Sequence, residues 1–219
     1  MHQLKTRGER LHLGGLLKQL VGDGLLNQAD ANSIAANRRG ADAALMHPLD
    51  TIAARQCSHA ETSEPVTVVM LCQWLATKVE LEFVALDPLK INVPAVTAEM
   101  SFAYAQRYGI LCIQVNDTEL VVATSEPFDR SWIESLQQTS KKTVRPVLAK
   151  PQEIEKYRLE FYSLAKSVFG ALSAKTGAGM TDFEQLLEVG GLKDADAQDQ
   201  HIVNIVDWLL QYAFEQRAS

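Results

Sequence analysis

The sequence predicts an α+β protein, in which a helical N-terminal part precedes a small mixed sheet with helices packed on it. Three observations lead to this prediction. Residues 13–78 repeat apolar side chains at three- and four-residue spacing, which is the period of a helix. Residues 81–162 alternate β-rich and helical stretches in the order β-α-β-β-α-β-α. The chain has 219 residues, 47% of them hydrophobic, which is enough to bury a core of this size.

Four helices are predicted within residues 13–79. The first carries a stripe of apolar residues and ends in the turn 22–24, where two glycines flank an aspartate. Asn27 caps a second helix, and Pro48 fits the first turn of a third. After the polar loop 59–65, Thr67 caps a fourth helix that runs to residue 79.

Strands and helices alternate in the second part. Strands are predicted at Leu81–Leu86, Ile110–Val115, Leu120–Thr124 and Thr143–Leu148. The polar stretch 116–119 predicts that the second and third of these form a hairpin. Helices are predicted at Ala95–Tyr108, at Phe128–Gln138 and from Pro151 through Tyr162.

The C-terminal part differs in charge and in pattern. Residues 180–219 hold eight acidic and two basic residues, so they account for the whole net charge of −6. Small residues at 173–180 predict a linker, and seven apolar residues between Ile202 and Phe214 follow helical spacing. We therefore expect a helical subdomain at 1–79, a small α/β sandwich domain at 80–172, a linker at 173–200, and a helix at 201–219 that opens a further domain.

Composition excludes several classes of protein. A net charge of −6 and a pI near 5.4 argue against a nucleic-acid binder, which usually carries a basic face. No run of about 18 apolar residues exists, so we expect no membrane span. Three widely spaced cysteines favour reduced thiols over a disulfide framework.

The residues that could carry chemistry form no recognisable active site. The stretch 170–176 resembles a phosphate loop, but Ala174 stands where a glycine must precede Lys175. None of the five histidines pairs with another ligand at metal-binding spacing, so no metal is expected. Cys72 and Cys112 lie in apolar patterns and are interpreted as core residues. A Cys–His enzyme remains the weakest alternative.

Three short motifs make residues 81–162 more specific. Asp87-Pro88 follows the first predicted strand, and Arg107-Tyr108-Gly109 precedes the hairpin. Residues 123–129 then have the pattern Ala-Thr-x-x-Pro-x-Asp, ending in Pro127 and Asp129. In this order the motifs resemble the N-terminal domain of the assembly ATPases of type II secretion and type IV pilus machines, the GspE/PilB family. Residues 201–219 are similar to the helix that leads into the second domain of these ATPases.

The resemblance implies a non-catalytic docking and regulatory region. Its expected partners are the inner-membrane platform protein of a secretion or pilus machine and the ATPase domain of its own chain. The parent protein is expected to be a homo-hexamer, cytoplasmic and peripheral to the inner membrane through these partners. ATP and Mg are expected only in the motor domain of that parent, and no cofactor is expected in residues 1–219.

The resemblance also supplies an alternative function. Residues 13–78 occupy the place of a helical subdomain that binds cyclic di-GMP in some family members, through a motif resembling Arg-Leu-Gly-x-x-Leu-x-x-x-Gly-x-Ile. Four residues match this motif: Leu16, Leu20, Gly24 and Leu26. Gly15 stands where the arginine should be, and no second copy of the motif follows. A lost arginine removes the guanidinium that pairs with or stacks on a nucleotide, so we expect absent or very weak binding.

Overall fold

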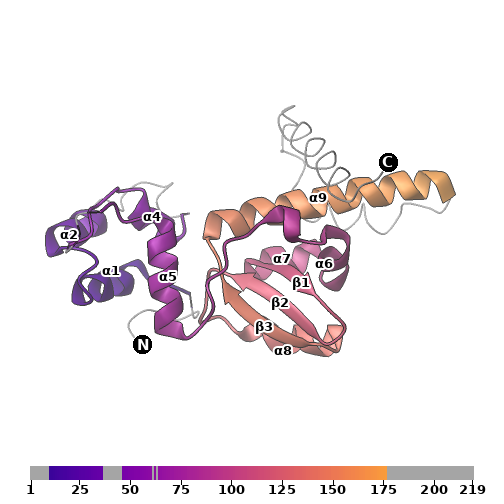
Figure 1. The fold of residues 1–219 in the computed structure, drawn as a ribbon, viewed down its shortest axis with the longest axis horizontal. Coiled ribbons are helices and arrows are strands. Elements are labelled where there is room, and N and C mark those ends of the chain that lie inside the picture. Colours follow the sequence, from indigo (N-terminus) through magenta and orange to yellow (C-terminus); the bar gives the residue numbers. More distant parts are fainter. Residues whose placement is uncertain (1–9, 37–45, 61, 63, 177–219) are drawn as a thin grey trace.

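The computed structural model describes residues 10–36, 46–60, 62 and 64–176, with side chains up to residue 166. It has the predicted α+β fold, in which a helical part comes first and a three-stranded sheet follows (Figure 1). We call the described residues up to 79 the helical lobe and residues 80–166 the sheet lobe. The predicted helix at 201–219 lies outside the described residues.

Short helices build the helical lobe. They are α1 (Leu13–Gly22), α2 (Gln28–Ala36), α4 (Pro48–Ala53) and α5 (Val68–Val79). The predicted caps are confirmed: the Asn27 side chain accepts from the Asp30 N–H, and the Thr67 side chain accepts from the Met70 N–H. Such caps matter because helices this short are marginal without tertiary contacts. Leucines from α1, α4 and α5 then meet in one apolar core.

Three strands form the sheet in the order β1-β2-β3. Strand β1 (Ile110–Val115) pairs antiparallel with β2 (Glu119–Thr124), and β2 pairs parallel with β3 (Thr143–Leu148). The hairpin is confirmed, because the Asn116 side chain accepts the backbone N–H groups of Thr118 and Glu119 and closes the turn.

Helices cover the sheet. They are the 3₁₀ turn η1 (Pro88–Lys90) and the α-helices α6 (Val93–Glu99), α7 (Phe102–Tyr108), α8 (Ser131–Ser140) and α9 (Pro151–Thr176). Helices α6, α7 and α9 gather beside β1, whereas α8 packs next to β3 (Figure 1). Their apolar faces enclose a second core that includes Trp132. Helix α9 includes residues 173–176 of the expected linker.

The strand predicted at Leu81–Leu86 is not formed, and this corrects the order β-α-β-β-α-β-α. Phe83 makes only an isolated parallel bridge with Leu148, in which the Val84 N–H donates to the Leu148 carbonyl and the Leu148 N–H donates to the Glu82 carbonyl, both at 2.8 Å. One reason lies in β3: Pro146 has no N–H to donate toward a neighbouring strand. Pairing also cannot continue past Leu148, because β3 ends there.

The helix predicted at Ala95–Tyr108 is two helices, α6 and α7. Met100 between them is extended and buried, so its side chain joins the core instead of continuing the helical turn. Ser101 then begins a new helix by accepting the Tyr104 N–H with its hydroxyl.

The helix predicted at Phe128–Gln138 begins and ends later, as α8. The Asp129 carboxylate accepts from both the N–H and the hydroxyl of Ser131, which holds residues 128–130 in a turn. The aspartate that the sequence placed inside the helix therefore precedes it.

Candidate functional site

The turn between α1 and α2 carries the four residues that match the nucleotide motif. Gly24 has a φ of 76°, in the left-handed region that favours glycine. The N–H groups of Leu25 and Leu26 both donate to the Leu20 carbonyl, which tightens the turn. The exposed fractions of the Leu16, Leu20 and Leu26 side chains are 0%, 0% and 1%. These three leucines therefore fill the core of the helical lobe.

The polar side of the same turn is held by Asp23. Its carboxylate accepts from the Trp74 indole N–H at 2.7 Å and pairs with the Lys78 ammonium at 2.8 Å. Hydrogen bonds from Lys78 and Trp74 lower the pKa of Asp23, so the carboxylate stays charged. An anionic nucleotide at this turn would lie near the Asp23 carboxylate. The Lys78 ammonium is already paired with that carboxylate.

The motif residues of the sheet lobe stabilise turns. The Asp87 carboxylate accepts the Leu89 N–H at the start of η1, directly before Pro88. Gly109 ends α7 with a φ of 64°. The Arg107 guanidinium lies over the Tyr108 ring, 5.3 Å from its centroid.

The third motif is also a turn. Pro127 is buried, and Asp129 starts α8 through its contacts with Ser131. Each of the three motifs thus forms a turn of its own.

The cysteines offer no activated nucleophile in the described part of the chain. Burial raises the pKa of Cys72 and of Cys112 to about 12, and burial also raises the pKa of Cys57. A thiol acts as a nucleophile only as the thiolate, so Cys72 and Cys112 are inert near neutral pH, and the raised pKa of Cys57 disfavours its thiolate. Among the described residues, no group of three or more His, Cys, Asp or Glu is placed to hold a metal ion.

Comparison with known proteins shows that the sheet lobe is similar to a known domain family. Residues 79–168 match the MshEN domain. The matched residues coincide with the sheet lobe, whereas Leu16, Leu20, Gly24 and Leu26 lie outside them.

A curated relative extends the likeness beyond the MshEN domain. The chain is 37% identical over 209 residues to the type IV pilus assembly ATPase TfpB of Acinetobacter baylyi, covering 93% of this chain and 35% of TfpB. The chain thus spans about a third of that relative's length. Together with the MshEN match, this confirms the resemblance to the N-terminal region of GspE/PilB-family ATPases.

Solved structures with lower similarity include MshE with cdg, which is 22% identical with a TM-score of 0.47 and covers 70% of this chain and 100% of that one. The N-terminal domain of XpsE is 12% identical with a TM-score of 0.40, covering 65% of this chain and 90% of that one. No helix among the described residues is long and apolar enough to cross a membrane.

Sequence reasoning missed a polar contact between the lobes. It joins Glu126, which lies inside the third motif, to Leu11 and His47 of the helical lobe. The only local signal was His47 directly before Pro48, an arrangement in which the imidazole can cap a helix. Nothing in the spacing could pair it with Glu126, because the contact is formed by the tertiary fold.

Proposed function

We propose that this chain is the docking and regulatory N-terminal region of a type IV pilus assembly ATPase, and that it connects the cytosolic motor to the inner-membrane platform without catalysing a reaction itself. The observation that carries the proposal is the 37% identity to TfpB along 93% of the chain. It favours pilus assembly over secretion, a choice that the sequence motifs alone left open.

The described residues support a binding role over a catalytic one. The buried thiols are protonated, and the motif residues Asp87, Gly109 and Asp129 are used in turns. A docking region needs a rigid scaffold and an accessible surface, and it does not need an activated nucleophile.

Competition in cells tests the proposal. When the isolated chain is produced in a piliated host that carries the full ATPase, it should occupy the platform and reduce the number of pili. A matched control is the same chain with Trp132→Ala, which removes a core side chain of the sheet lobe and should not compete. Normal piliation at an excess of the folded chain over the ATPase would contradict the docking role.

Direct binding gives a second measurement. The chain immobilised on a biosensor should bind the cytosolic segments of the platform protein, and titration with Mg-ATP should release no heat. The second result is expected because no glycine-lysine phosphate loop is present in the sequence. Micromolar ATP affinity in this chain would overturn the non-catalytic assignment.

The sensor alternative makes a different prediction. Because Leu16, Leu20 and Leu26 are core residues and the Lys78 ammonium is already paired with Asp23, titration with cyclic di-GMP should give no saturable binding. Sub-micromolar binding that is lost in Gly24→Val, with the fold retained by circular dichroism, would replace the docking proposal with a nucleotide-sensing one.

A further inference from the structure

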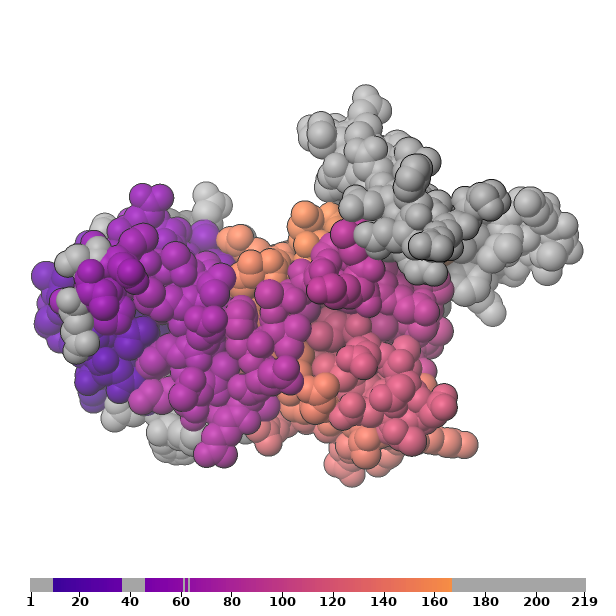
Figure 2. Space-filling model, in the orientation of Figure 1, coloured from indigo at the N-terminus to yellow at the C-terminus, as the bar shows by residue number. Residues whose placement is uncertain are grey.

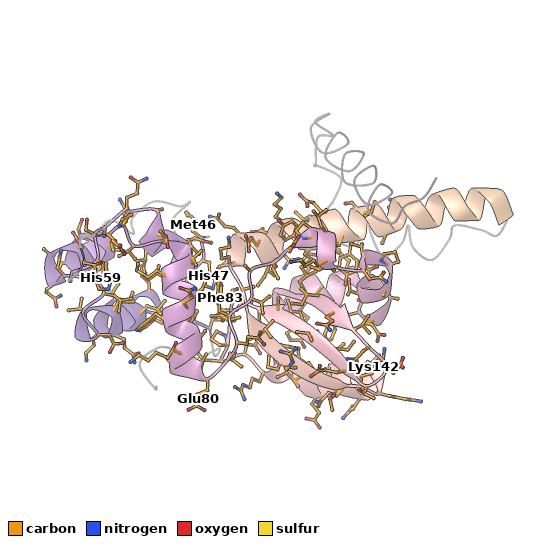
Figure 3. All side chains as sticks on the ribbon, viewed as in Figure 1. Met46, His47, His59, Glu80, Phe83 and Lys142 are labelled. Carbon is orange, nitrogen blue, oxygen red and sulfur yellow. The ribbon has the colours of Figure 1, made fainter. Side chains whose placement is uncertain are left out.

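The helical lobe and the sheet lobe meet along an apolar contact. Leu148, the last residue of β3, is fully buried in the core of the helical lobe, and Phe83 and Phe128 pack against that core. The two lobes are in contact in the space-filling view (Figure 2), and His47 and Phe83 lie where they meet (Figure 3). This apolar packing holds the two lobes together.

One carboxylate adds polar contacts at the edge of this surface, of which one is a hydrogen bond. Glu126, in the turn after β2, accepts the backbone N–H of Leu11 with Oε2 at 2.6 Å. Its Oε1 lies 3.4 Å from Nε2 of His47. The side chains of His47 and Glu126 are only 13% and 17% exposed, so solvent screens this pair weakly.

His47 both caps α4 and lies against Glu126. His47 Nδ1 accepts the Leu49 N–H at 3.3 Å, so Nδ1 carries no proton in this arrangement. The other ring nitrogen, Nε2, is the one near the Glu126 carboxylate, and it makes no hydrogen bond in the described part of the chain. The same side chain caps α4 and reaches the sheet lobe.

Glu126 is itself held by its own turn. Its N–H donates to the Thr124 hydroxyl at 3.0 Å, and its carbonyl accepts the Asp129 N–H at 3.2 Å. A carboxylate on such a braced turn can hold the chain just before α1 and just before α4, two segments far apart in the sequence.

The covalent connection between the lobes has a special conformation. Glu80 ends α5 with a φ of 56°, in the left-handed region that is costly for a residue with a side chain, and it is exposed. A change at this one residue would reorient α5 relative to the segment 81–86.

We propose that Glu126 is a latch that sets the orientation of the two lobes, with Glu80 as the hinge that the latch keeps in its strained conformation. When the latch is lost, the starts of α1 and α4 loosen and the connection at Glu80 opens, while the sheet core stays intact. This device goes beyond the docking role and does not depend on it.

Hydrogen exchange and proteolysis of the full chain test the latch. In Glu126→Ala, peptides that contain Leu11 and the start of α4 should exchange about tenfold faster than in the parent, the effect of losing a charge-assisted hydrogen bond. Endoproteinase Glu-C should cleave after Glu80 faster by a similar factor. Peptides from β1 and α7 should exchange at the parent rate.

Two further variants make the result decisive. Glu126→Gln retains an acceptor for the Leu11 N–H but places an amide against His47, so it should give an intermediate effect. The matched control is Glu134→Ala, which removes an exposed carboxylate from α8. It should change neither the hydrogen exchange at Leu11 and α4 nor the rate of cleavage after Glu80. Parent-like exchange at Leu11 and parent-like cleavage at Glu80 in both Glu126 variants would overturn the proposal, as would equal acceleration in β1.

Discussion

The helical lobe and the sheet lobe are stabilised in different ways. The helical lobe depends on leucines from helices of only 6 to 12 residues, and a short helix gains most of its stability from packing and caps. In the sheet lobe, β2 is hydrogen-bonded on both sides, and its residues from Leu120 to Thr124 are buried. The comparison teaches that one lobe is held mainly by side chains and the other by side chains and a backbone ladder together.

The largest expected effect comes from the core of the sheet lobe. Trp132 is 1% exposed, so Trp132→Ala should lower the free energy of unfolding by about 3–5 kcal/mol, as large aromatic truncations in cores do. Urea unfolding followed by far-ultraviolet circular dichroism measures it. The matched control is Trp74→Ala, in which a half-buried indole of the helical lobe is removed at lower cost. A larger loss of unfolding free energy in Trp74→Ala than in Trp132→Ala would contradict the described burial of the two side chains.

Leu148 tests whether the two lobes are coupled. It belongs to β3 but is buried in the helical-lobe core, so Leu148→Ala should cost about 2–5 kcal/mol and increase hydrogen exchange in both lobes. Leu71→Ala, a fully buried leucine of α5, should increase exchange mainly in the helical lobe. Identical hydrogen-exchange patterns in the two variants would show that Leu148 couples the two lobes no more than Leu71 does.

A smaller, pH-dependent effect is expected at Asp50 in α4. Burial raises the pKa of Asp50 above its ordinary value of 3.8, and its Oδ1 has no hydrogen-bond partner. Since the folded state binds this proton more tightly than the unfolded state, parent stability falls as pH rises from 3.8 through the raised pKa. Asp50→Asn should remove this slope, so the variant gains stability relative to the parent as pH increases. Thermal melts of both proteins over a pH series that starts near 4 and rises to neutral measure this slope. Parallel curves for the two proteins would exclude a role for the Asp50 charge.

The smallest expected changes in the free energy of unfolding have opposite signs in the two lobes. Gly109 has a φ of 64° with nothing near its absent Cβ, so Gly109→Ala should cost about 1 kcal/mol through backbone strain alone. Gly22 lies in the last turn of α1, also without a neighbour, so Gly22→Ala should add about 0.4–1 kcal/mol by restricting the unfolded chain. Chemical denaturation of each variant gives both values. A gain at Gly109 would mean that this residue does not hold the left-handed conformation in solution.

Local chemistry predicted the elements whose ends depend on nearby residues. Asn27, Pro48 and Thr67 start helices where the sequence places them, and Gly109 ends α7 as predicted. The prediction was wrong where a distant partner decides the outcome. The β-rich run at 81–86 lacks a ladder because its neighbour carries Pro146, and the helix at 95–108 divides because Met100 is drawn into the core.

For the candidate site, too, the sequence identified the residues but the tertiary structure decided where their side chains lie. Position within a motif identified Leu16, Leu20, Gly24 and Leu26, but pattern matching does not distinguish a leucine that lines a ligand site from one that fills a core. Their side chains are buried in the described fold, and a role in ligand binding stays a prediction.

By itself, the sequence determined the α+β class, the order of the helical part before the sheet part, the hairpin at 116–119 and most helix starts. Each of these depends on residues within about one or two turns of each other, where periodicity and capping act. Only the tertiary structure decided that Glu126 meets Leu11 and His47, that Asp23 meets Trp74, and that Leu148 enters the core of the other lobe. These contacts join residues that are far apart in the chain, and their formation depends on how whole elements pack, which local pattern does not encode.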